Sequence, residues 1–169
     1  MAAGRQRCMY CEDSQGTDID HFCPKSEYPL GTFDWGNLLL ACSYCNSNAK
    51  RTEFPRDEED EPLLIDPTSE DPFEHLTFVP DTGTYQPQTT KGEETCRVFA
   101  LNRQILSQGR HDAWVILSEL VPRLALARAA GREELVTKLM AVVVRLSFSA
   151  VLLKFRATAN SDIKALLLI

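Results

Sequence analysis

The order of apolar and polar positions predicts four elements in the first third of the chain. Residues 17–22 have the pattern of a strand, and the apolar run at 38–41 indicates a second strand. The segment PKSEYPLGTFDWG between them holds two prolines and two glycines, which favour a loop. Residues 42–51 have helical character and stop before Pro55. The expected local order is therefore strand, loop, strand, helix.

The rest of the chain changes from a loop-rich to a helical pattern. Residues 57–95 are rich in Pro, Asp, Glu, Thr and Gly, and residues 76–79 are expected to pair with a strand after Gly83 across a DTG turn. From Arg97 onward, apolar residues recur at helical spacing: Trp114, Leu117, Leu120, Val121 and Leu124. We expect one or two helices over 103–130, a break at Gly131 and further helix over 135–155.

These patterns predict an α+β fold in three parts. The first is a compact module at residues 1–56, the second an acidic loop-rich connector at 57–95, and the third a mainly α-helical part at 96–169. The helical part has a high density of apolar residues, which must be buried against other residues. Its helices are expected either to pack on one another and on the connector, or to bind another chain.

Charge is distributed unevenly over these parts. The net charge of −6 divides into −1 for residues 1–56, −11 for 57–95 and +6 for 96–169. The acidic connector should be repelled from nucleic acid and face solvent, whereas a basic helical part suits a phosphate backbone or an acidic partner.

Cellular location is inferred from the ends of the chain and from its cysteines. The N-terminal MAAGRQRC contains no apolar leader, and charged residues interrupt the apolar C-terminal part, so we expect a cytoplasmic protein without a membrane span. Those charged residues are Lys138, Arg145, Lys154 and Arg156. In a reducing compartment, paired CxxC motifs indicate metal binding rather than disulfides.

Four of the six cysteines form the strongest chemical signal. They occur as two CxxC pairs separated by 30 residues, namely Cys8, Cys11, Cys42 and Cys45. Each pair supplies two corners of a tetrahedron, so together they predict a closed structural zinc site. Such a site has no open coordination position, and the zinc is expected to stabilise a small module rather than to do chemistry.

Polar residues between the two pairs predict a reaction centre. Asp20 and His21 follow the apolar Ile19, Asn37 precedes the leucine run, and Asn46 lies directly after Cys45. A neutral imidazole is suited to act as a general base near neutral pH, and carboxylate and amide oxygens suit a hard divalent cation. In a regular strand Asp20 and His21 would point to opposite faces, so we expect the strand to end or distort there.

The motifs CMYC, DIDHF with PKS, WGNLLLAC and SYCNSNAK with FP resemble the HNH endonuclease superfamily, whose fold is a ββα-metal finger. By this resemblance, His21 is the general base and Asn37 orients the loop and the histidine. Asp20 and Asn46 would be the protein ligands of one catalytic Mg2+ or Mn2+, with Asn48 an alternative ligand. A histidine is frequent at the position of Asn46 in this superfamily, so the chain is an HNN variant, which favours an oxygen-preferring cation.

Further motifs, EPLLIDP, EHLTF and LNR, resemble the bacterial HNH nucleases that act with an ABC-type ATPase in Septu-type and retron-linked anti-phage defence. This resemblance implies a DNA substrate and an ATPase partner on the C-terminal helices. Two alternatives stay open: a non-catalytic zinc-finger adaptor that binds nucleic acid, and an RNA- or tRNA-directed HNH nuclease.

Several other polar and aromatic residues have less specific interpretations. Lys25 and Lys50 are candidate phosphate ligands, and Asp18 is expected to have a turn or capping role rather than to be a second metal-binding carboxylate. Trp35 is expected to pack beside the module rather than to stack on a base. His75 and His111 have no partners at a useful spacing and receive no function.

Overall fold

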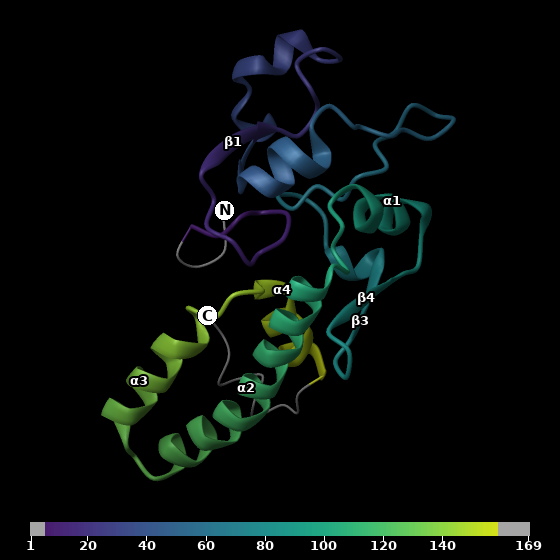
Figure 1. Cartoon of the computed structure of the whole chain (residues 1–169). Coiled ribbons are helices and arrows are strands. Elements are labelled where there is room, and N and C mark those ends of the chain that lie inside the picture. Colours follow the sequence, from purple (N-terminus) through teal and green to yellow (C-terminus); the bar gives the residue numbers. More distant parts are fainter. Residues whose placement is uncertain (1–5, 159–169) are drawn as a thin grey trace.

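A computed structural model, which describes residues 6–158, has the expected α+β architecture (Figure 1). It contains two small two-stranded antiparallel sheets and a mostly helical C-terminal part. In Figure 1 the first sheet and its loop lie at one end of the molecule, and helices α2 and α3 extend toward the other. The fold class predicted from the sequence is confirmed.

The first sheet pairs β1 (Asp18–His21) with β2 (Leu38–Ala41), and Asp20 lies opposite Leu39. Burial follows the two-residue period of a strand, since Asp20 and Leu39 are buried whereas Ile19 is 58% exposed. Both predicted strands are present. β1 ends at His21, where the sequence required the strand to stop if Asp20 and His21 were to serve one site.

The loop between these strands contains two short 3-10 turns, η1 (Pro29–Phe33) and η2 (Trp35–Asn37). The Asp34 carboxylate accepts a hydrogen bond from the Gly36 amide at 3.0 Å and so caps η2. Trp35 is 86% exposed, so the expectation that it packs beside the module is wrong. The turn that carries Trp35 is closed by polar bonds, from Asp34 to the Gly36 amide and from Asn37 to the Gly31 carbonyl, and does not depend on burial of the indole.

The helix predicted after the second strand is present as η3 (Tyr44–Lys50), which has π-helical hydrogen bonding. The amide of Arg51 donates to the carbonyl of Asn46 at 2.8 Å, a step of five residues. Arg51 has a φ of 52°, which ends the helix because continued helix requires negative φ. The module therefore has the predicted order of strand, loop, strand and helix.

The connector contains more structure than its composition predicts. The expected hairpin is confirmed as β3 (Leu76–Val79) paired with β4 (Thr84–Pro87), and η4 (Pro72–Glu74) precedes it. α1 (Thr90–Val98) begins within the connector, before the helical pattern expected from Arg97. The Thr89 hydroxyl accepts from the amide of Gly92 at 3.1 Å, and this N-cap starts the helix among polar residues.

Three helices follow: α2 (Gln104–Ala129), α3 (Glu133–Val143) and α4 (Ser149–Thr158). The break at Gly131 is confirmed, but the continuous helix expected over 135–155 is wrong, because residues 144–148 separate α3 from α4. Glu12 holds the start of α4: its carbonyl accepts from the amide of Phe148 at 3.2 Å, and its carboxylate accepts from the amide of Ala150 at 3.1 Å. Phe148 has a φ of 64°, which is incompatible with continued helix.

One hydrophobic core joins residues of all three parts of the chain. It includes Cys8, Ala41, Phe54, Leu64, Phe78, Phe99, Leu106, Leu117, Val143 and Val151. The acidic run at 57–61 lies on the surface, as expected. Among the helices within residues 6–158, none combines the length and the apolar content that crossing a membrane requires.

Candidate active site and metal centre

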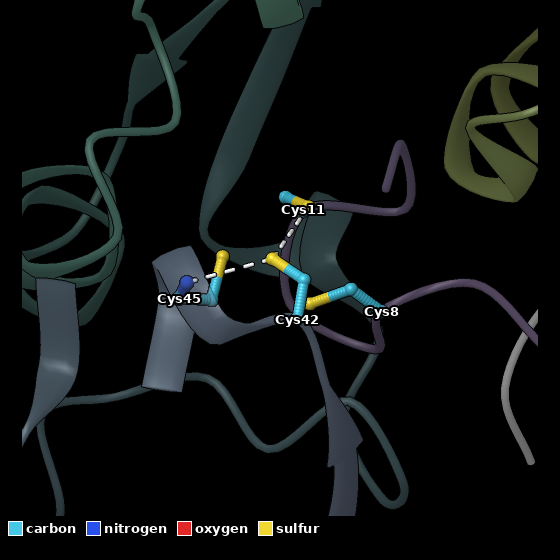
Figure 2. Close-up of side chains that lie close together, drawn as sticks. All are labelled: Cys8, Cys11, Cys42 and Cys45. Atoms are coloured by element: carbon cyan, nitrogen blue, oxygen red, sulfur yellow. Dashed lines mark hydrogen bonds between the residues drawn. The ribbon is translucent and has the colours of Figure 1, made fainter. Parts of the chain in front are cut away.

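The four cysteines of the CxxC pairs converge on one buried point (Figure 2). Their sulfur atoms all lie within 4.8 Å of one another. Sγ of Cys11 and Sγ of Cys42 are 3.9 Å apart, close to the roughly 3.8 Å edge of a tetrahedron whose metal–sulfur bonds are about 2.3 Å long. This arrangement can hold one metal ion with four protein ligands, as the spacing of the cysteines predicted.

The electrostatics of the cluster favour a bound cation. Hydrogen bonds from Cys11, and then from Cys45 and Cys8, lower the pKa of the Cys42 thiol. Hydrogen bonds with Cys11, and then with Cys42 and Cys8, raise the pKa of the Cys45 thiol, and burial raises it further. Several buried thiolates in contact repel one another, so a cation is needed before all four can be deprotonated.

Asp20 lies on the inner face of β1, where its carboxylate already has two partners. Nζ of Lys50 is 3.0 Å from Oδ2 of Asp20, and the two side chains are 0% and 6% exposed. The Tyr10 hydroxyl donates to the same oxygen. Burial, and then the Asp20 charge, raise the pKa of Tyr10, so the phenol keeps its proton for this bond. Asp20 is thus a compensated buried carboxylate.

His21 and Asn37 both hold the loop between the strands. Nε2 of His21 lies 2.9 Å from the carbonyl oxygen of Thr32. The Asn37 side chain accepts from the amide of Cys23 at 2.7 Å and donates to the carbonyl oxygens of Cys23 and Gly31, at 3.0 and 3.2 Å. Since Gly31 and Thr32 are adjacent, the two side chains fix one point of the loop, His21 from the end of β1 and Asn37 from the end of η2.

Asn46 faces β1 from η3, and its partner is Asp18 rather than Asp20. Nδ2 of Asn46 donates to the Asp18 carboxylate at 3.3 Å, and this bond leaves the amide oxygen of Asn46 available as a ligand. Asp18 and Asp20 are two residues apart and share one face of β1. Asn48 is exposed on η3. The face between β1 and η3 therefore carries oxygen donors from Asp18, Asp20 and Asn46.

Among the site residues, Lys50 has the position that differs most from the one predicted from the sequence, which was that of a phosphate ligand. It is fully buried, and Nζ donates to the carbonyl oxygen of His21 at 2.7 Å as well as pairing with Asp20. A lysine held in this way is not available as a phosphate ligand, so that interpretation is wrong. Its spacing of four from Asn46 did place both residues on the face toward β1.

Tyr10 was not expected at the site; its position between two cysteines was the one available signal.

Replacing Lys50 by methionine is expected to destabilise the module. The change leaves the Asp20 carboxylate buried without its counter-charge, which costs about 3–5 kcal/mol. We expect the free energy of unfolding, measured by chemical denaturation, to fall by this amount. The matched control is Lys50→Met combined with Asp20→Asn, which removes both charges and should recover at least half of the loss. A Lys50→Met protein as stable as the wild type would contradict the buried ion pair.

The cysteine cluster and the ββα order together define a known class of nuclease domain. Residues 8–52 match the family of HNH endonucleases, over a span that contains all four clustered cysteines and the polar residues between them. The first third of the chain therefore carries an HNH endonuclease domain, as its motifs predicted.

Two curated relatives extend the similarity beyond this domain. The chain is 32% identical over 135 residues to a Septu protein PtuB of Bacillus mycoides (strain KBAB4), covering 62% of this chain and 45% of the relative. It is 33% identical over 102 residues to a Septu protein PtuB of Bacillus thuringiensis, covering 57% of this chain and 37% of the relative. The chain thus spans less than half the length of these relatives. No solved structure matches.

Proposed function

We propose that this protein is a metal-dependent HNH endonuclease that hydrolyses phosphodiester bonds in DNA. The observation that carries the proposal is the match of residues 8–52 to the HNH family, since this span contains both the imidazole of His21 at the end of β1 and the oxygen donors of Asp18, Asp20 and Asn46. A general base adjacent to a site for a hard cation is the arrangement that phosphodiester hydrolysis requires.

His21 is proposed as the base that takes a proton from the attacking water. A carbonyl oxygen only accepts hydrogen bonds, so the contact with Thr32 puts the proton of the neutral ring on Nε2. Nδ1 then carries the lone pair and is the basic atom. The bond also orients the ring, and Asn37 supports it by holding the neighbouring Gly31 carbonyl.

The residues between β1 and η3 suit Mg2+ or Mn2+, with Asp20 and Asn46 as the proposed ligands and Asp18 as a further oxygen donor. All three offer oxygen, which hard cations prefer. Lys50 compensates one of the two carboxylates, and a divalent ion together with one phosphodiester would bring the total charge of the site to zero. When bound, the ion would offset charge on the phosphate and on the leaving oxygen.

The cysteine cluster is proposed to hold zinc in a purely structural role. Four thiolates close the coordination shell and leave no position for substrate. The ion would tie the N-terminal residues to the start of η3, and so keep Asn46 opposite β1.

Cleavage of plasmid DNA tests the nuclease proposal directly. We expect the purified protein, with its partner present, to nick or linearise plasmid in Mg2+ and to stop when EDTA is added in excess. Activity with Mg2+ should be at least 100-fold above that with EDTA, since charge neutralisation at the phosphate contributes several kcal/mol. Parallel incubation with RNA of the same sequence distinguishes an RNA-directed nuclease, and cleavage that EDTA leaves unchanged would contradict metal dependence.

The chain is further proposed to act in the cytoplasm as the nuclease subunit of an ATPase-associated anti-phage defence complex. Support comes from the resemblance to that class and from the similarity to Septu protein PtuB. Residues 1–56 would be the nuclease module, 57–95 the connector and 96–169 the partner-binding part. Exposed apolar side chains on α2, such as Ile105 and Leu126, suit the docking of an ABC-type ATPase.

A further inference from the structure

Three large apolar side chains project from the loop between β1 and β2. Leu30, Phe33 and Trp35, here called the apolar crest, are 93%, 93% and 86% exposed. Figure 1 shows their segment, η1 and η2 in indigo, at the end of the molecule opposite α2 and α3. Single exposed apolar residues are common in proteins, but three within six residues form a surface suited to binding.

The crest is presented on an ordered backbone. The Thr32 hydroxyl donates to the carbonyl of Pro29 at 2.6 Å, Asp34 accepts from the amide of Gly36, and Asn37 donates to the carbonyl of Gly31. These bonds involve residues on both sides of Phe33. The backbone that carries the crest is therefore held in position, which lowers the backbone entropy lost on binding.

The crest is connected to the proposed base through one residue. Thr32, whose carbonyl accepts from His21 at 2.9 Å, directly precedes Phe33. The backbone that carries Phe33 therefore lies beside the imidazole, one residue from the bonded carbonyl. A protein bound there permanently would cover His21 and exclude the substrate, whereas a nucleotide base on the crest and the phosphate at His21 can belong to one nucleic-acid strand.

The charge of the loop indicates which part of a nucleic acid the crest contacts. Residues 24–37 carry one basic residue, Lys25, and two acidic ones, Glu27 and Asp34. This composition does not attract phosphate. Flat aromatic side chains instead stack on the faces of bases, and bases in a regular duplex have no free faces. Apolar side chains also insert where base steps are already unstacked.

We propose that Leu30, Phe33 and Trp35 hold unstacked bases next to the phosphate at His21, so that the enzyme prefers single-stranded or distorted DNA to regular duplex. The proposal rests on the nuclease function above, since it assigns the substrate class of the same site. It also gives a role to three large side chains that contribute nothing to the core.

The test compares binding of a fluorescent single-stranded DNA and of the same sequence as a duplex, in EDTA and with His21→Ala to prevent cleavage. Phe33→Ala combined with Trp35→Ala should weaken single-strand binding at least 10-fold, since each stacked base contributes about 1–3 kcal/mol. Duplex binding should change less than twofold. The matched control, Leu135→Ala with Val142→Ala, removes two exposed apolar side chains from α3 and should change neither affinity.

A second readout does not depend on the double substitution. Single-stranded DNA should quench the tryptophan fluorescence of the protein, and Trp35→Phe should abolish the quench while retaining affinity, because phenylalanine still stacks. The proposal would be overturned if Phe33→Ala with Trp35→Ala left the single-strand affinity unchanged and single-stranded DNA did not quench the wild-type fluorescence. It would also be overturned if this double substitution weakened duplex and single-strand binding equally. Fluorescence quenching by single-stranded DNA without any cleavage by the wild type would contradict the nuclease function instead. Cleavage rates that the crest substitutions do not change would contradict the proposed role of the crest alone.

Discussion

His21→Ala is expected to abolish DNA cleavage while leaving the fold and the metal content unchanged. The side chain is half-buried and contacts the loop through one hydrogen bond, so its loss removes little packing. The chemical loss is larger, because a positioned general base contributes about 10²–10⁴-fold to the rate. The measurement is the initial rate of plasmid cleavage, together with circular dichroism and metal analysis of the variant.

The chain offers a matched control for this substitution. His111 is also half-buried, and its Nδ1 lies 3.0 Å from the carbonyl oxygen of Pro80, so it resembles His21 in exposure and in bonding. His111→Ala should cleave within about twofold of the wild type, because it lies on α2 and has no place in the proposed chemistry. Normal cleavage by His21→Ala would show that another group is the base.

Cys42→Ser is expected to lose the structural metal and to unfold the nuclease module. Cys42 contacts the sulfur of Cys11 at 3.9 Å and also accepts from the amide of Cys45 at the start of η3. A serine hydroxyl is a poor metal ligand at neutral pH, and structural zinc sites contribute about 10–16 kcal/mol in small zinc domains. Elemental analysis should show zinc falling from one ion per chain to near zero, with a matching loss of ordered structure.

The comparison for this substitution is Cys23→Ser. Cys23 is half-buried, lies outside the four-cysteine cluster and makes only a long contact of 3.7 Å with Arg56 through its sulfur. This variant should keep one zinc ion per chain and a wild-type unfolding transition. Full zinc content in Cys42→Ser would overturn the assignment of the four ligands.

The rigid frame of the module and the proposed base, His21, are built from different residues. The cysteine cluster and the Lys50–Asp20 pair are buried and fix β1 against η3. His21 and Asn37 act on the other side of the strand, where they hold the loop that carries the crest. A substitution in the frame is therefore expected to change stability first, and one in the loop to change activity first.

Local patterns in the sequence determined much of the module. The CxxC spacing predicted the cluster, because two residues between ligands place two sulfurs on one turn, and the tetrahedron follows from the donor type. The strands around Asp20 and Leu39 followed from their apolar runs, and the hairpin of β3 and β4 from its DTG turn. The resemblance of DIDHF and SYCNSNAK to HNH motifs pointed to the family that residues 8–52 match.

The partners of the polar side chains could not be read in the same way. Nothing in the local sequence shows that Lys50 turns inward to Asp20 rather than outward to phosphate, since both positions are compatible with a helix face. The exposure of Trp35 was also unpredictable, because an indole in a loop packs inward only where the fold brings apolar groups to it. These choices depend on distant residues.

The sequence by itself thus predicted the order of elements in the first module, the cysteine cluster and the family that residues 8–52 match, all of which depend on residue type and short spacing. Only the tertiary structure decided the division of the C-terminal helices and the surroundings of the proposed site. Glu12, far from α4 in sequence, accepts from the amides of Phe148 and Ala150 and so caps the start of α4. Apolar residues continue at a high density through residues 144–148, and a contact with a distant carboxylate leaves no pattern in the local sequence.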